Sequence, residues 1–93
     1  MIQFLVHDKH DTVGVAVVDV KSGQTLEGRD LSSNETLSAK SLADIPLGHK
    51  IALRDFKVGD TILKYGCDIG KVVQPIRAGE HVHTHNLKTK RWA

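Results

Sequence analysis

Four short segments of the chain share one hydrophobic pattern, in which apolar residues lie three positions before and three positions after a glycine. The segments are 20–26, 45–51, 56–62 and 76–82, centred on Gly23, Gly48, Gly59 and Gly79. Glycine adopts positive φ at little cost, so it suits the tight position of a chain reversal. The pattern therefore predicts four similar turns whose apolar flanks begin or end strands.

The stretches between these turns are typical of short strands. Residues 12–20 are rich in β-branched side chains. Further strands are predicted at 50–56, 61–66, 69–76 and 81–88, and residues 34–45 are expected to run extended into the turn at Pro46. No segment keeps a convincing helical period over ten residues. The expected fold is mostly β, with short strands joined by glycine turns in a compact pair of layers or a partial barrel.

The size of the chain limits what it can do alone. With 93 residues, 40% of them apolar and four aromatic, it is expected to form one domain over residues 1–93 with a thin core. Such a domain has little room for an enclosed substrate cavity. The net charge of +2 is too weak to indicate nucleic acid as a partner. The basic segment 86–93 is expected to be a solvated tail or a docking segment.

Cysteine usage and the N-terminus bear on location. Cys67 is the single cysteine, so it cannot form an internal disulfide, and a free thiol suits a reducing compartment. Without an activating neighbour in sequence, it is expected to be a packed thiol rather than a nucleophile. The apolar run at the N-terminus is too short for a signal peptide or a membrane span. We therefore expect a cytoplasmic protein without a membrane partner.

The segment "HVHTH" carries histidines at alternate positions, His81, His83 and His85. In a strand these side chains project to one face, and two imidazoles at that spacing can converge on a metal ion. A further ligand would come from elsewhere, with candidates in the N-terminal segment: His7, Asp8, His10 and Asp11. The same alternation is also typical of the solvated face of a strand, and the spacing alone leaves both readings open. His49, directly after a turn glycine, reads as a surface position.

Residues 44–87 taken together resemble the SAF-type domain of the altronate and galactarate dehydratase family. The resemblance is carried by "DIPLGHKIAL", "KYG", "IG" and "AGEHVHTHNL", and "DTVGVAVVDV" at 11–20 looks like the start of the family's domain. It implies a SAF-like β-clip fold. It also implies a small subunit working with a large catalytic lyase subunit, in a complex that can itself form a homo-oligomer. The combined enzyme would eliminate water or sulfite from a hydroxy acid such as altronate, galactarate or sulfolactate, with Fe²⁺ as cofactor. The short chain and its "KTKRW" ending favour sulfite elimination.

The resemblance also directs attention to particular histidines. Elimination beside a carboxylate needs a base for the α-proton and assistance for the leaving group. His83 and His85 are the expected catalytic residues, and His81 and His7 the expected substrate-binding residues; no metal ligand is assigned. We expect the isolated chain to be inactive. The alternatives are a noncatalytic SAF-like binding or assembly module and a stand-alone metal-binding protein.

Overall fold

The computed structural model describes residues 1–8, 10–64, 67–83 and 86–88. Over these ranges the chain forms strands and no helix, so the predicted mostly β fold is confirmed. The strands are β1 (Phe4–Val6), β2 (Val13–Ala16), β3 (Thr25–Asp30), β4 (Thr36–Lys40), β5 (Lys50–Ala52), β6 (Thr61–Lys64), β7 (Cys67–Val72), β8 (His81–Val82) and β9 (Leu87–Lys88). Across the described residues there is no helix long and apolar enough to cross a membrane.

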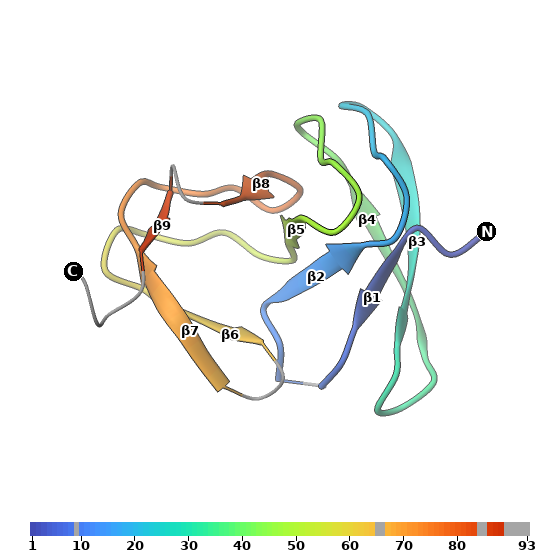
Figure 1. Cartoon of the computed structure of the whole chain (residues 1–93), viewed down its shortest axis with the longest axis horizontal. Coiled ribbons are helices and arrows are strands. Elements are labelled where there is room, and N and C mark those ends of the chain that lie inside the picture. Colours follow the sequence, from blue (N-terminus) through green and yellow to red (C-terminus); the bar gives the residue numbers. More distant parts are fainter. Residues whose placement is uncertain (9, 65–66, 84–85, 89–93) are drawn as a thin grey trace.

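The strands form two sheets that lie beside each other (Figure 1). One sheet has six strands in the order β4-β3-β1-β2-β5-β8, and the other has three in the order β6-β7-β9. Within the six-stranded sheet β1 runs parallel to β3, and the other neighbours are antiparallel. The short strand β8 therefore lies at one edge, paired with β5 alone.

The four glycine turns associate in two pairs, and each pair is joined by an antiparallel bridge. Val20 pairs with Ile45, and Phe56 pairs with Ile76. Each glycine N–H then donates across its pair to a carbonyl at 2.8 Å, the acceptors of Gly23, Gly48, Gly59 and Gly79 being Ser41, Ala16, Val72 and Ala52. The same exchange occurs twice, so the four predicted turns form two bridged pairs.

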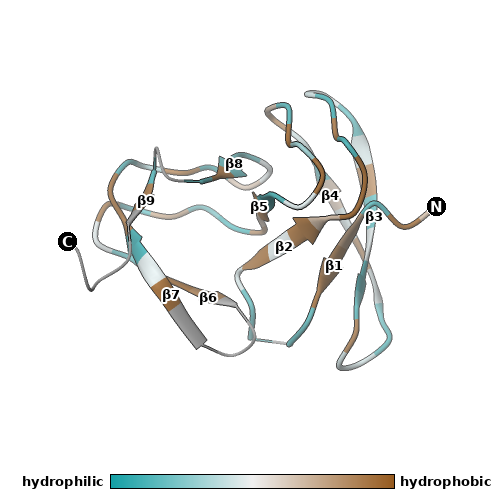
Figure 2. Cartoon of the chain, viewed as in Figure 1, coloured by the Kyte–Doolittle hydropathy of each residue, from teal (hydrophilic) through white to brown (hydrophobic). Residues whose placement is uncertain are grey.

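The apolar residues that begin each turn motif are all buried. They join two separate core clusters, one around each pair of turns. Figure 2 shows hydrophobic positions, in brown, on strands such as β1, β2 and β7. One cluster contains Phe4, Val6, Ala16, Val20, Leu26, Ile45 and Ile51, and the other contains Val13, Ala52, Phe56, Ile62, Val72, Ile76 and Val82. Burial of these side chains, at about 1.5–3 kcal/mol for each large one, is what holds the paired turns together.

Several features of the strand prediction need correction. The strands predicted at 12–20, 50–56 and 69–76 end earlier, at Ala16, Ala52 and Val72. The predicted strand over 81–88 is wrong, because β8 ends at Val82 and a turn at Asn86 precedes β9. The strands β1 and β3 were not predicted. In β3 the buried positions are Leu26, Gly28 and Asp30, so its alternation is hidden by a glycine and a carboxylate. A Cβ at Gly28 would lie 2.2 Å from the Phe4 ring, which shows that this position faces the core and has no room for a side chain.

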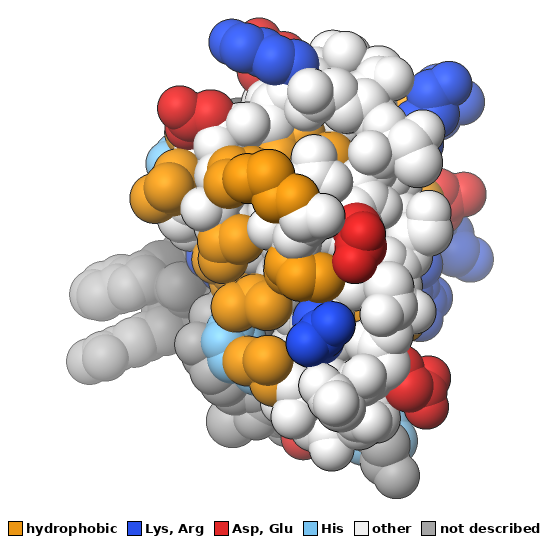
Figure 3. All heavy atoms as spheres, turned by 90° about the vertical axis from the view of Figure 1, so that its right-hand side faces the viewer, with side chains coloured by type: hydrophobic (Ala, Val, Ile, Leu, Met, Phe, Trp, Pro, Cys, Tyr) orange, Lys and Arg blue, Asp and Glu red, His pale blue; other side chains and the backbone are white. Residues whose placement is uncertain are grey.

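Part of the surface remains apolar. Figure 3 shows neighbouring apolar side chains gathered on the face that lies at the right of Figure 1. Large apolar side chains exposed at the surface include those of Leu42, Leu47 and Val58. Leu47 and Val58 occupy the same place in their turns, one residue before the glycine, so two of the turn tips present apolar side chains to solvent.

Candidate functional site

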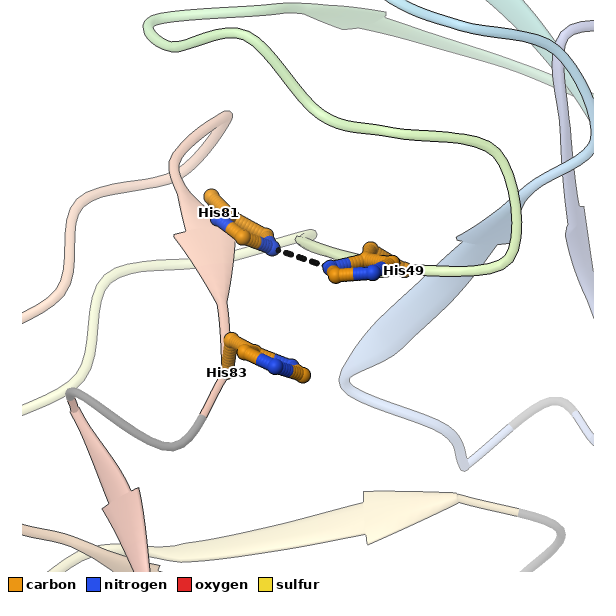
Figure 4. A group of neighbouring side chains, drawn as sticks. All are labelled: His49, His81 and His83. Carbon is orange, nitrogen blue, oxygen red and sulfur yellow. Dashed lines mark hydrogen bonds between the residues drawn. The ribbon is translucent and has the colours of Figure 1, made fainter.

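Three histidines from two parts of the chain form a cluster. They are His49, His81 and His83, and one ring nitrogen of each lies within 4.8 Å of the others. Figure 4 shows the three rings pointing into the same space from the turn before β5 and from the segment at and after β8. His49 and His81 are half-buried and His83 is exposed, so the cluster is supported by the fold on one side and open to solvent on the other.

The rings are in direct contact. Nδ1 of His49 lies 2.8 Å from Nε2 of His81, a hydrogen bond that places one proton between the two nitrogens. The ring of His83 stacks on that of His49, with centroids 4.5 Å apart, and is nearly parallel to the ring of His81. The arrangement concentrates three imidazole rings, whose nitrogens can form hydrogen bonds or bind a metal ion.

Strand pairing explains how distant residues meet. Ile51 of β5 pairs with His81 of β8, and Lys50 pairs with Val82. His49 directly precedes β5, and its carbonyl accepts a hydrogen bond from the backbone N–H of Ala16 at 2.9 Å. The β5–β8 pairing thus brings the two parts of the cluster together.

Asn86 fixes the backbone on the β8 side. Its side chain is buried, its Oδ1 accepts from the N–H of His83 at 2.9 Å, and its Nδ2 donates to the carbonyl of His81 at 2.7 Å. The carbonyl of His83 in turn accepts from the backbone N–H groups of Asn86 and Leu87. One amide side chain therefore holds both histidine backbones, which is a supporting role that sequence reasoning missed.

The structure brings some of the predicted site residues into the cluster and not others. His81 and His83 do project to one side, as the alternation predicted, whereas His85 lies outside the described residues. His7 follows β1 in a loop where its N–H and that of Asp8 donate to Asp11 Oδ2 at 3.3 and 3.2 Å, and it is not a member of the cluster.

The interpretation of His49 as a plain surface position is wrong, because its ring lies against both other histidines. The third member of the cluster therefore comes from the turn before β5, not from the N-terminal segment 7–11 that was expected to supply it. The signal in the sequence was the residue after the glycine: three of the turns have a carboxylate or amide there, and this turn has an imidazole.

The donor set fits a transition-metal ion. Imidazole nitrogens suit Fe²⁺, Zn²⁺, Cu²⁺ and Ni²⁺, and each would lie about 2.1 Å from the ion. His49, His81 and His83 are the residues that would hold it, after the proton between the first two has left. Without a metal, the same three rings can exchange protons with a substrate at the open side.

The chain as a whole is similar to known proteins. The family profile described as the altronate/galactarate dehydratase SAF domain matches residues 2–90. The chain is 53% identical over 92 residues to the (2R)-sulfolactate sulfo-lyase subunit alpha of Chromohalobacter salexigens, covering 98% of both chains. It is 56% identical over 61 residues to the subunit of the same name in Paracoccus pantotrophus, covering 66% of this chain and 91% of the relative.

A second kind of relative is much longer. The altronate dehydratase of Bacillus subtilis is 42% identical over 89 residues, which are 96% of this chain but 17% of that protein. The same domain thus occurs both as a short chain and as a small part of a long one. The family profile spans nearly all residues of the chain, and relatives of both lengths match it. The chain therefore belongs to the altronate/galactarate dehydratase SAF domain family.

Proposed function

We propose that this chain is the small subunit of a two-component lyase that eliminates sulfite or water from a hydroxy acid. The observation that carries the proposal is the 53% identity to a sulfolactate sulfo-lyase alpha subunit over 98% of both chains. Sulfolactate is favoured over altronate because the identity to the sulfo-lyase subunit is 53%, whereas the identity to an altronate dehydratase is 42%. Such a complex would act in the cytoplasm.

The partner is a large catalytic subunit that covers the open side of the histidine cluster. His83 is exposed, so the cluster is open to solvent on that side, and an elimination reaction needs a site that excludes water around charged intermediates. A second subunit would supply those walls, and the exposed Leu47 in the turn of His49 offers it an apolar contact.

The chemistry assigned to this chain is proton transfer and charge stabilisation. Removal of the α-proton leaves negative charge on the substrate carboxylate, which needs cationic or hydrogen-bonding groups placed in advance. His83 is the exposed member of the cluster and is placed to take or return a proton, whereas His81 and His49 share one proton at 2.8 Å and can orient the substrate. Fe²⁺, when bound, would polarise the carboxylate and assist the leaving group. His85 remains a proposed catalytic residue, and His7 a proposed substrate contact.

The test is reconstitution with the large subunit. The 93-residue chain is co-purified anaerobically with its partner, supplied with Fe²⁺, and assayed for sulfite release from sulfolactate and for water elimination from altronate and galactarate. Activity on one acid that requires both chains supports the proposal and identifies the substrate. Full activity of the large subunit alone would overturn it and leave a noncatalytic assembly module. Activity of this chain alone would also contradict the proposal.

A further inference from the structure

Three of the four glycine turns share one backbone hydrogen bond, but their side-chain contacts differ. In two of them the N–H of the residue after the glycine donates back to the residue three positions earlier, from Asp60 to Lys57 and from Glu80 to Arg77, both at 3.0 Å. In the turn of the histidine cluster His49 donates to Pro46 in the same way, at 2.9 Å. The turn at His49 is therefore not distorted relative to the others.

The side chain after the glycine behaves in one way in three turns. It folds back and accepts a hydrogen bond from the backbone N–H three positions earlier. The pairs are Lys21 N–H to Gln24 at 2.9 Å, Lys57 N–H to Asp60 at 2.8 Å, and Arg77 N–H to Glu80 at 2.6 Å. These side chains are occupied in closing their own turns.

In the fourth turn both residues of this hydrogen bond are different. Pro46, which has no N–H, stands at the donor position, and His49 stands at the acceptor position. The Nδ1 atom of His49 is attached to Cγ, as is the Oδ2 atom with which Asp60 accepts, so an N–H at position 46 would lie within reach of Nδ1. Nδ1 is the atom that instead lies 2.8 Å from Nε2 of His81.

We propose that Pro46 is a positioning residue for the histidine cluster: by removing the N–H that would hold Nδ1 of His49 in its own turn, it directs that ring to His81 and His83. Proline also fixes φ at the start of the turn. The turn keeps its place without the lost contact because the N–H of Leu47 donates to Asp19 Oδ1 at 2.9 Å. This inference deepens the proposed function, on which its importance for catalysis rests.

The experiment uses the full 93-residue chain and the variant Pro46→Ala, which returns an N–H to the turn. Co²⁺ affinity is measured by titration, and the ring nitrogens of His49 and His81 are followed by long-range ¹H–¹⁵N NMR. We expect the His49 Nδ1 signal to change, the new amide at position 46 to be protected from exchange, and Co²⁺ affinity to fall about 10-fold or more, as for other residues that orient metal ligands. Pro75→Ala is the matched control, since Pro75 is the other proline of the chain and precedes a different turn.

A second variant keeps the test decisive if Pro46→Ala unfolds. Pro46→Lys keeps His49 and places at position 46 the residue type of Lys57, whose N–H donates in its own turn, so its amide at position 46 should be protected and the His49 Nδ1 signal should change. Unchanged ring signals and Co²⁺ affinity in folded Pro46→Ala, or free exchange at position 46 in both variants, would overturn the inference. A reconstituted complex without lyase activity would instead count against the proposed function, and the ring signals of His49 would still decide the role of Pro46.

Discussion

Nδ1 of His49 lies 2.8 Å from Nε2 of His81, although 32 positions separate the two residues in the chain. The contact depends on the pairing of β5 with β8, which begins at the residue after His49 and includes His81 itself. His83 adds a third ring against His49, with centroids 4.5 Å apart. A change at any one of these imidazoles therefore alters the surroundings of the other two.

Replacing a cluster histidine by alanine should reduce both metal binding and turnover. His49→Ala, His81→Ala and His83→Ala each remove one of three nitrogen donors that lie within 4.8 Å of one another. We expect weaker Co²⁺ binding by each variant, measured by titration. In the complex with the large subunit, kcat should fall about 100-fold or more, the usual scale for a lost acid or base.

His10→Ala is the matched control for this series, because His10 is exposed and is not a member of the cluster. Its metal affinity and turnover should equal those of the unmodified chain. Near-normal turnover of all three cluster variants, once assembled with the partner, would instead identify the chain as an assembly module.

Substitutions of Asn86 should separate its two hydrogen bonds. Asn86→Ala leaves the N–H of His83 and the carbonyl of His81 without their side-chain partner, which should lower the free energy of unfolding by about 1–3 kcal/mol. Asn86→Asp keeps an acceptor for His83 but places a charged carboxylate oxygen against the carbonyl of His81 at a buried position, so it should destabilise the chain at least as much as Asn86→Ala. Urea unfolding of the two variants at neutral pH measures the difference. A clearly smaller loss in Asn86→Asp would mean that the amide donor to His81 contributes little.

The local turns could be predicted from the sequence, whereas their pairing could not. The motif around each glycine is local, and all four turns were placed correctly. Which turn pairs with which depends on contacts such as Val20 with Ile45, which lie 25 positions apart and leave no periodic signal. The strand β3 was missed for a similar reason. Its residue Gly28 faces the core against the ring of Phe4, and the hydropathy of a glycine does not indicate such burial.

The site was predictable in part. The alternation of His81 and His83 indicated correctly that both side chains project to one side, but it suggested a longer strand than the structure has. The turn at Asn86 ends that strand by using an amide side chain as a backbone partner, which hydrophobic patterns do not report. His49 was predicted to be a surface residue because it directly follows a turn glycine. Its contact with His81 depends on the pairing of β5 with β8, which the local sequence does not report.

Stability should depend on Asp30 in the acid range. Ser32 donates to Asp30 Oδ1 through its hydroxyl at 2.6 Å and its N–H at 2.8 Å, and these hydrogen bonds, the hydroxyl foremost, lower the pKa of the Asp30 carboxyl. Because the folded pKa lies below the unfolded value of about 3.9, this stabilisation is complete above that value and is lost as the pH falls through the folded pKa.

Asp30→Asn should therefore be less stable than the unmodified chain at neutral pH, and the difference should shrink as the solution becomes acidic. Urea midpoints measured at pH 7 and at about pH 3 would show this convergence. Ser32→Ala should behave in the same direction, because it removes the hydroxyl that lowers the Asp30 pKa most. A constant difference across this pH range would contradict the assignment.

Gly79 should be the least replaceable of the turn glycines. Gly79 and Gly59 have φ of 92° and 96°, so alanine at either position adopts a left-handed conformation at a cost of about 1–2 kcal/mol. A Cβ at Gly59 meets nothing within 4 Å, whereas a Cβ at Gly79 would lie 2.0 Å from the carbonyl oxygen of Lys40. The carbonyl of Gly79 also accepts from the N–H of Leu42 at 2.9 Å, so relief of the clash would break a contact between the two pairs of turns.

We therefore expect Gly79→Ala to be destabilised by about 1–3 kcal/mol more than Gly59→Ala, the cost typical of overpacking, in paired urea unfolding experiments. Because Gly79 precedes His81 by two residues, a backbone shift there should also displace the cluster and weaken Co²⁺ binding, whereas Gly59→Ala should leave it unchanged. Equal losses of stability in the two variants would show that the backbone at Lys40 can move away from the added Cβ at no cost in stability. An unaltered Co²⁺ affinity in Gly79→Ala would show that β8 keeps its place against β5 without this turn.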